Sequence, residues 1–205
     1  MRPAYAITVL ALVLAVGALI YVNRNFSAVG NNEGTIINSS TTPVMPSSLS
    51  LTSSEFVNSG KIPPKYTCDG DPPAGGVNPP LQISGVPGEA KSLVLIMDDP
   101  DVPKRGNPDA VFDHWILFNI PPQTSEIAMG MTVGVPGRNS AGKVEYAAPC
   151  PPREYEPSEH RYFFKLYSLD SELSLPAGAS KSEVEKAMEG HVLAETQLIG
   201  RYERQ

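Results

Sequence analysis

The segment SLVLIMDDPDVP, residues 92–103, runs from six mainly apolar residues directly into three aspartates within four positions. A short apolar run bounded by turn-forming residues is typical of a β-strand whose two faces are both covered. Pro100 and Pro103 restrict the residues that precede them to extended conformations. We therefore predict a buried strand over residues 92–98 that ends in a rigid acidic loop.

Other segments carry strand signals of the same kind. VFDHWILFNI (111–120) and HRYFFKLYSL (160–169) are rich in β-branched, aromatic and leucine residues, and LQISGV (81–86) is a weaker candidate. The nearly continuous apolar character of the two stronger segments predicts strands covered on both faces, in the middle of a sandwich. HVLAETQLIGRY (191–202) is expected to be a closing strand, with a short helix as its alternative.

One helix is clearly indicated near the C-terminus. Ser180 can cap it, Glu183 follows three positions later, an apolar stripe lies behind them, and Gly190 can end the helix. The 21 prolines and 17 glycines favour many short strands joined by turns over further long helices. The predicted fold class is therefore mostly β, with one or two short helices.

Length and charge limit the class of protein. A chain of 205 residues with 41% apolar content can bury one good core, which predicts one globular domain. The 22 acidic side chains outnumber the 16 basic ones, and the basic residues are scattered along the chain. Nucleic acid is therefore not an expected partner.

The N-terminal part of the chain has a different composition. After a flank at residues 1–3, residues 4–22 form an apolar run of 19 residues without a charge. Because a helix rises about 1.5 Å per residue, this run can cross a hydrocarbon layer. We expect a single-pass transmembrane anchor. A cleaved signal peptide is the alternative, although the run ends in large residues instead of the small ones that a cleavage site needs.

A polar segment follows the predicted anchor. Residues 23–50 are rich in Ser, Thr and Asn and too poor in large apolar residues to fold alone, so we expect a disordered tether. The folded domain is expected over residues 51–205. Arg2 and the α-amino group outweigh Arg24, which favours a cytoplasmic N-terminus and an extracytoplasmic domain.

The acidic loop and the strand starts suggest a common site. Alternation along a strand puts His114 on the face of Phe112, Ile116 and Phe118, and His160 on the face of Tyr162, Phe164 and Leu166. If the strand ends meet at one rim of a sandwich, a single polar pocket floored by aromatic residues results. Its expected lining residues are Asp99, Asp101, His114, His160 and Tyr162.

A structural interpretation of the same residues stands beside this one. A single histidine on an apolar strand is more often a core residue with its hydrogen bonds satisfied, and aspartate beside proline is ordinary turn chemistry. The combination favours a site, because two of the three histidines fall at equivalent strand starts. The third, His191, follows Gly190 and is expected to be a cap or a surface residue.

The two cysteines, Cys68 and Cys150, lie 82 residues apart. On the outer side of a membrane they are expected to pair, and a loop of this length would stabilise the fold by about 4 kcal/mol in the chain-entropy model. A structural thiol is the first alternative. The second is Cys150 as a nucleophile served by His160, which no accompanying motif supports.

Five blocks of the sequence resemble the phosphatidylethanolamine-binding protein family, in its bacterial and archaeal branch of Raf-kinase-inhibitor-like proteins. They are DDPDVP, FDHWILFNIP, PCPP, HRYFFKLYSLD and AMEGHVLAETQLIGRYER. The resemblance extends over residues 50–204. It implies a β-sandwich of a large and a small sheet, with an anion or head-group pocket lined by the five residues named above. Pro151, in PCPP, would form another wall of that pocket.

These observations predict a membrane-tethered, non-enzymatic binding module without a cofactor or a metal. Its expected ligand is a phosphorylated small molecule or a phospholipid head group. One alternative is an inhibitor that binds a protease or a kinase, because the family includes such inhibitors. Another is a metal-dependent phosphoester hydrolase that uses the two aspartates and the two histidines, although their spacing lacks the closely placed ligand pair of strong metal sites.

Overall fold

The central strand of the fold is β4 (Ser92–Asp99), in a computed structural model that describes residues 48–70 and 76–205. All eight residues of β4 are buried. The strand pairs with β8 (Glu159–Leu169) on one side and β5 (Phe112–Ile120) on the other, both antiparallel. The predicted strand and its covered faces are thus confirmed for the segment at the start of the acidic loop.

The described strands form two sheets. The large sheet has the order β2-β9-β8-β4-β5-β7, and the small sheet has the order β1-β3-β6. Neighbouring strands are antiparallel, apart from the parallel pair β2 and β9. The bounds of the remaining strands are β1 Ser50–Thr52, β2 Gly60–Lys61, β3 Leu81–Ser84, β6 Glu126–Ile127, β7 Val135–Pro136 and β9 Val192–Glu203. A short 3₁₀ helix, η1, spans Pro64–Tyr66.

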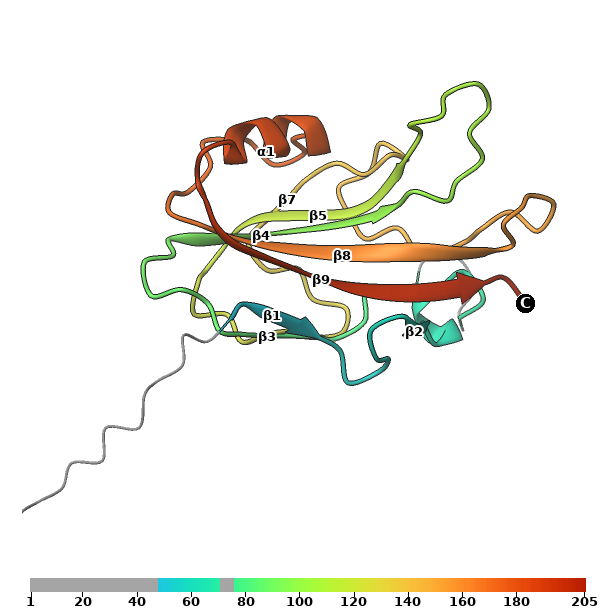
Figure 1. Ribbon diagram of the computed structural model, residues 1–205, viewed down its shortest axis with the longest axis horizontal. Helices are drawn as coiled ribbons and strands as arrows, with labels where there is room; N and C mark the ends of the chain where they lie inside the picture. The colour runs from blue at the N-terminus through green and yellow to red at the C-terminus, as the bar shows by residue number, and fades with distance from the viewer. Residues whose placement is uncertain (1–47, 71–75) are drawn as a thin grey trace, which may run out of the picture. The chain divides into compact units, whose positions relative to one another are not determined.

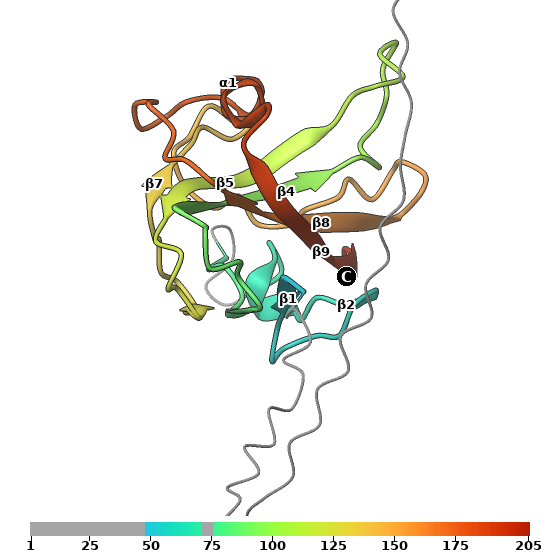
Figure 2. The same cartoon turned by 60° about the vertical axis from the view of Figure 1, so that its left-hand side comes forward.

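The two faces of the large sheet are covered by different elements (Figure 1). The small sheet packs on one face, and the larger apolar core lies between the sheets around Trp115, Tyr162 and Phe164. Helix α1 (Lys181–Met188) covers part of the other face, over a smaller core that includes Ile116 and Phe118. The turned view shows the same three layers (Figure 2). The predicted mostly-β sandwich of a large and a small sheet is confirmed.

Helix α1 begins as its sequence predicts. The Ser180 hydroxyl accepts a hydrogen bond from the Glu183 backbone N–H, and the Glu183 carboxylate accepts from the Ser180 backbone N–H at 2.8 Å. This reciprocal capping satisfies backbone donors that have no partner within the helix. Val184 and Met188 point into the smaller core, so the capped end fixes which face of the helix is buried.

Strand β8 departs from the expected two-sided burial. Its residues alternate between buried and more exposed, because α1 leaves the outer face of β8 uncovered. The apolar ring on that face, Phe163, is instead flanked by the Arg161 guanidinium at 5.6 Å and the Lys165 ammonium at 5.9 Å from the ring centroid. Long cationic side chains can cover apolar surface in this way while their charged ends stay in water.

Several predictions fall on residues that the structure does not describe. The anchor at residues 4–22 and most of the tether lie outside the described ranges. Within residues 48–70 and 76–205, no helix is long and apolar enough to span a membrane. Leu49 is buried in the larger core and Ser50 begins β1, so both residues belong to the fold.

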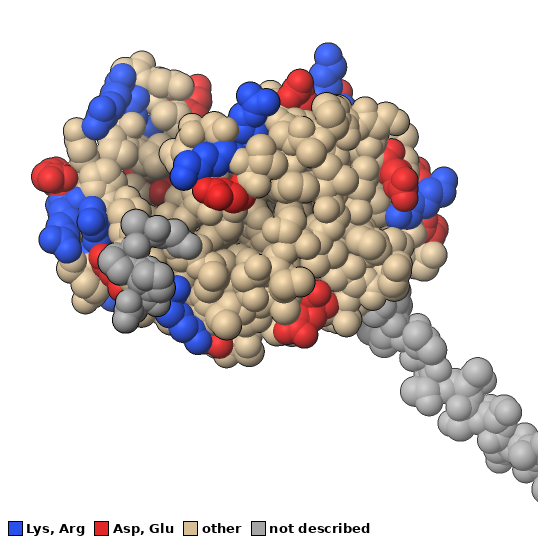
Figure 3. Space-filling model, turned by 180° about the vertical axis from the view of Figure 1, so that it is seen from behind, with Lys and Arg blue, Asp and Glu red and all other residues tan. Residues whose placement is uncertain are grey.

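Charged side chains do not gather by sign on the face shown in Figure 3. Lysine and arginine are interspersed there with aspartate and glutamate. The formal net charge of the chain is −6. This face therefore offers no continuous basic surface of the kind that binds a phosphate backbone.

Candidate functional site

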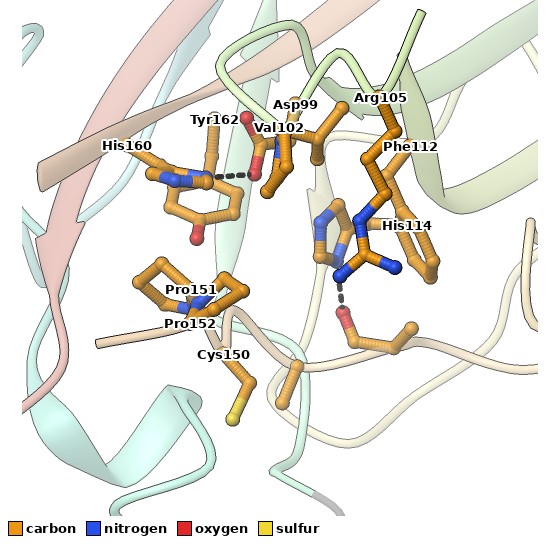
Figure 4. Close-up of a pocket in the computed structure, with 13 residues that line it drawn as sticks. Asp99, Val102, Arg105, Phe112, His114, Cys150, Pro151, Pro152, His160 and Tyr162 are labelled. Atoms are coloured by element: carbon orange, nitrogen blue, oxygen red, sulfur yellow. Dashed lines mark hydrogen bonds and ion pairs between the residues drawn. The ribbon is translucent and has the colours of Figure 1, made fainter. Parts of the chain in front are cut away.

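A cavity of about 530 Å³ lies where the inner strands β4, β5 and β8 begin or end, at one end of the large sheet (Figure 4). We call it the strand-end cavity. Its floor is polar and buried, and its walls are mostly apolar. The residues that line it are Asp99, Val102, Pro103, Arg105, Phe112, His114, Ala147, Ala148, Cys150, Pro151, Pro152, His160 and Tyr162.

Asp99 and His160 form a buried pair at the cavity floor. One carboxylate oxygen of Asp99 lies 2.7 Å from His160 Nδ1, and the other accepts the backbone N–H of Asp101 at 2.8 Å. The side chains of Asp99 and His160 are only 3% and 1% exposed. Because Nδ1 faces a carboxylate, we assign its proton there, and Nε2 has no hydrogen-bond partner within the described residues.

Tyr162 lies two residues after His160, on the same face of β8. The two rings are stacked with their centroids 6.5 Å apart. In Figure 4 the Tyr162 hydroxyl points toward Pro151 across the cavity. Burial raises the pKa of Tyr162, so the group remains an O–H donor. This hydroxyl, like His160 Nε2, has no hydrogen-bond partner within the described residues.

A β-bulge in β5 brings His114 to the same cavity. Met97 of β4 pairs with Trp115, whereas the next residue, Asp98, pairs with Asp113. His114 is therefore the extra residue on β5. A bulge interrupts the alternation of side chains and redirects the residue that it contains.

The bulge corrects the predicted face of His114. Its ring lies 5.2 Å from the Tyr162 ring and 4.7 Å from the Phe112 ring, measured between centroids. Ile116 and Phe118, which strict alternation placed beside His114, lie in the core under α1 instead. Alternation holds only along a regular strand, so the prediction was correct for Phe112 and wrong for the other two.

His114 is held as a neutral imidazole. Its Nδ1 lies 2.7 Å from the carbonyl oxygen of Ala147, which can only accept a hydrogen bond. Burial lowers the pKa of His114, and this effect exceeds the opposing effect of the hydrogen bond to Ala147. Nδ1 therefore carries the proton, and Nε2 is an acceptor. The cavity thus has a hydrogen-bond acceptor at His114 and a donor at Tyr162.

The wall opposite the histidines comes from residues 149–152. Pro151 and Pro152 line the cavity, as the resemblance implied for Pro151. Cys150 forms a disulfide with Cys68, with their Cα atoms 5.3 Å apart, and the Cys68 N–H donates to the Pro149 carbonyl at 3.0 Å. The predicted pairing is confirmed. A disulfide-bonded sulfur is no thiolate, so the alternative of Cys150 as a nucleophile does not fit this state.

Asp101 does not line the cavity, which corrects its predicted place. Its carboxylate accepts two hydrogen bonds from the Arg161 guanidinium, at 2.7 and 2.8 Å, and a third from the Arg161 backbone N–H at 2.9 Å. These bonds lower the pKa of Asp101. Only its backbone serves the site, through the N–H that holds Asp99.

Sequence reasoning missed Arg105 and Phe112 as lining residues. Both border the loop between β4 and β5 that the acidic segment opens. The signal for Arg105 was its place four residues after Asp101, in the same loop. The described residues contain no group of three or more His, Cys, Asp and Glu side chains arranged to hold a metal ion.

Comparison with known proteins gives one consistent family. Residues 52–203 match the family described as phosphatidylethanolamine-binding protein. A UPF0098 protein of Methanothermobacter thermautotrophicus is 46% identical over 167 residues, which cover 76% of this chain and 99% of the relative. A UPF0098 protein of Chlamydia trachomatis is 44% identical over 157 residues, with the same shares of the two chains covered.

Solved structures agree. The crystal structure of a phosphatidylethanolamine-binding protein homologue from Chlamydia trachomatis is 43% identical, with a TM-score of 0.71, and covers 78% of this chain and 99% of its own. YbcL of Escherichia coli shares the fold at 24% identity, with a TM-score of 0.66, over 77% of this chain and 99% of its own. The matched part makes up almost the whole of the Chlamydia chain, so in that protein a domain of this extent folds without further residues. The chain therefore belongs to the phosphatidylethanolamine-binding protein family.

Proposed function

We propose that the domain is a non-enzymatic binding module that takes a phosphorylated group into the strand-end cavity. One observation carries the proposal: Tyr162 and His160 each present a buried polar atom to this cavity without a hydrogen-bond partner among the described residues. A buried polar group without a partner is costly, and a ligand that supplies the partner recovers that cost. The other three such atoms, on Tyr66, Ser168 and Ser171, belong to residues outside the cavity lining.

The chemistry of the floor favours a phosphoryl group that also carries an amine or a hydroxyl. The Tyr162 O–H can donate to a phosphoryl oxygen. His160 Nε2 can donate as well when the imidazole is protonated, with Asp99 beside it to balance the charge. His114 Nε2 can accept from an ammonium or a hydroxyl group.

Three features argue against a catalytic role in the proposal. Asp99 has both carboxylate oxygens bonded within the fold, and Asp101 is bound to Arg161. Cys150 is in a disulfide. The two carboxylates and the sulfur that would serve a hydrolase as metal ligands or nucleophile are thus already engaged with the protein. Binding, by contrast, can use the polar atoms of Tyr162 and His160 that have no partner among the described residues.

The test uses Tyr162→Phe in residues 48–205, with phosphorylethanolamine as the probe. Removal of a hydroxyl that has no protein partner should leave the free energy of unfolding unchanged or slightly higher. The same change should weaken binding about tenfold, because one hydrogen bond to a charged group is lost. Calorimetric titration gives the affinity, and urea unfolding gives the stability.

Tyr146→Phe is the matched control. The Tyr146 hydroxyl donates to the Tyr66 carbonyl at 3.0 Å, outside the cavity lining. This variant should lose about 1 kcal/mol of unfolding free energy and keep the affinity of the parent. The proposal fails if the parent domain does not bind the probe, or if Tyr162→Phe binds it as well as the parent. Metal-dependent turnover of a phosphoester that is lost in His114→Ala and His160→Ala would replace the binding module with a hydrolase.

The proposal also places the domain on the outer side of a membrane, tethered by residues 4–22. The apolar run supports this, and so does the Cys68–Cys150 bond, because such bonds persist in oxidising compartments. The full chain should keep its N-terminus and stay with membranes in high salt. Recovery of a soluble form with a new N-terminus near Val29, or of a full-length cytosolic protein, would contradict the tether.

A further inference from the structure

The cavity lining contains one side chain with a permanent positive charge, Arg105, among the described residues. The other basic lining residues are histidines. His160 is paired with the Asp99 carboxylate, so a proton on it is offset locally. His114 is kept neutral by burial. An anion in the cavity therefore meets net positive charge only at Arg105.

Arg105 lies near the tip of the loop between β4 and β5. The side chain of its neighbour, Lys104, connects the two ends of that loop. The Lys104 ammonium donates to the Pro100 carbonyl at 2.6 Å and to the Ala110 carbonyl at 2.7 Å. These two carbonyls lie on opposite sides of the loop, so one side chain closes it. Arg105 itself has a positive φ of 35°, an uncommon conformation for a residue with a side chain. Figure 4 shows its side chain at the cavity, on the side of His114 and away from His160.

Tyr155 holds the guanidinium of Arg105 from a separate loop. Arg105 Nη2 donates to the Tyr155 hydroxyl at 2.9 Å, and the guanidinium lies 5.3 Å from the centroid of the Tyr155 ring. Tyr155 lies between the proline wall of the cavity and β8, so the contact joins two loops that lead to different walls. A guanidinium can stack on an aromatic ring and still use its remaining N–H groups for an anion.

We propose that Arg105 recognises the phosphoryl group of the ligand and that Tyr155 is the positioning residue that holds its guanidinium at the cavity. The inference rests on the proposed function and adds the residue that selects a phosphoryl group over an uncharged one. A planar guanidinium matches two phosphoryl oxygens at once, which a lysine ammonium cannot do. The ligand class is a phosphate ester, either a soluble one or a lipid head group.

Arg105→Gln in residues 48–205 is the direct test, with phosphorylethanolamine and methyl phosphate as probes. Affinity for both should fall about tenfold or more, because hydrogen bonds to a charged group are lost. The salt dependence of the affinity should fall as well, which a purely structural role of Arg105 would not change. Arg105→Lys should recover the salt dependence but only part of the affinity.

Arg153→Gln is the matched control for charge. Arg153 precedes Tyr155 by two residues, contacts the Gln205 carbonyl and does not line the cavity. The substitution removes the same charge, and the affinity should stay within about twofold of the parent because the exposed Arg153 side chain contacts the Gln205 carbonyl instead of the cavity and is screened by salt. An effect equal to that of Arg105→Gln would show that general charge, and not Arg105, attracts the probe, and would overturn the assignment.

Variants at Tyr155 test positioning. Tyr155→Ala removes the ring and should weaken binding about threefold, since the guanidinium then loses freedom only when the ligand binds. Tyr155→Phe keeps the ring and should stay close to the parent. Two results would remove Tyr155 from the proposal. One is an unchanged affinity in Tyr155→Ala. The other is a double variant, Tyr155→Ala with Arg105→Gln, whose loss of binding free energy equals the sum of the two single losses, because Tyr155 would then act independently of Arg105.

A second part of the experiment distinguishes a lipid head group from a soluble phosphate ester. Vesicles of phosphatidylcholine and phosphatidylethanolamine are sedimented with the parent domain and with Arg105→Gln. Binding that depends on Arg105 supports a lipid head group, whereas binding of the soluble probes alone supports a soluble phosphate ester. Equal affinity of parent and Arg105→Gln for every probe, while Tyr162→Phe still loses affinity, overturns the role of Arg105 and leaves the proposed function intact. No binding by the parent overturns both.

Discussion

Asp98 and Asp99 are consecutive residues of β4 and are equally buried, each with 2% of its surface exposed. They point to opposite faces of the large sheet. Asp98 accepts from the ammonium groups of Lys165 at 2.7 Å and Lys181 at 2.8 Å. Asp99 instead pairs with His160, whose second ring nitrogen lies at a cavity.

The two aspartates differ in the side chains that they bind, lysines at Asp98 and a histidine at Asp99. Lys181 is the first residue of α1, and Asp98 with Asp113 holds its ammonium so that the helix stays on the sheet. Burial opposes the charge on Lys181, yet the hydrogen bond that its ammonium donates to Asp98 and the other acidic contacts raise its pKa overall. A lysine so held stays charged and has a structural role. The His160 imidazole keeps a second ring nitrogen for a ligand, so the aspartate that holds it supports binding on the other face.

The largest expected effect tests whether a covalent bond supports the cavity face. Replacing both Cys68 and Cys150 by serine should lower the free energy of unfolding by about 4 kcal/mol, because the long loop becomes unrestricted in the unfolded chain. Affinity for phosphorylethanolamine should fall too, since Pro151 and Pro152 follow Cys150 in the wall. Urea unfolding and calorimetric titration measure the two effects. Unchanged stability would show that the bond is absent, which thiol labelling of the unfolded parent would confirm.

Asp98→Asn is expected to have the next largest effect. It takes the buried carboxylate away from Lys165 and leaves Lys181 with Asp113, and we expect a loss of about 3 kcal/mol in unfolding free energy. Ligand affinity should not change. Asp99→Asn should show the reverse, with a smaller loss of stability and about tenfold weaker binding. If both variants change stability and affinity alike, the two faces do not divide structure from binding.

The third effect concerns the pH dependence of stability that His114 causes. The pKa of His114 is lowered from 6.5 by burial, so the unfolded chain takes up a proton at a higher pH than the folded one. The contribution of His114 to stability is therefore fully present above pH 6.5, the ordinary pKa of the unfolded chain. It is lost as the pH falls below 6.5, by at most about 1.4 kcal/mol per pH unit. His114→Asn keeps a donor for the Ala147 carbonyl and should flatten this slope. Urea unfolding between about pH 5 and pH 7.5 measures it, and an unaltered slope would assign the dependence to other groups.

The smallest effect concerns the helix end alone. Ser180→Ala removes the cap of α1 and should lower the free energy of unfolding by about 1 kcal/mol. The affinity for phosphorylethanolamine should stay as in the parent, because α1 packs on the smaller core and none of its residues lines the strand-end cavity. A clear loss of affinity in this variant would mean that the helix face and the cavity are coupled through β4 and β5.

Local patterns in the sequence predicted the elements of this comparison well. The apolar segment that becomes β4, the strand that starts at His160 and the capping box at Ser180 each depend on neighbours within a few residues. Tyr162 and His160 were correctly placed on one face because β8 is regular there. The resemblance to the family also predicted correctly that Pro151 lines the cavity.

Only the tertiary structure decided where Asp101, His114 and Arg105 act. Asp101 accepts from Arg161, 60 residues away, because the register of β4 against β8 brings them together. The bulge at His114 depends on the pairing of β5 with β4, which a single strand does not reveal. Arg105 meets Tyr155 only when two loops lie beside one cavity. The sequence by itself thus determined which segments become strands and helix, through short-range periodicity and capping. The partner of each polar side chain was decided by the packing of distant segments.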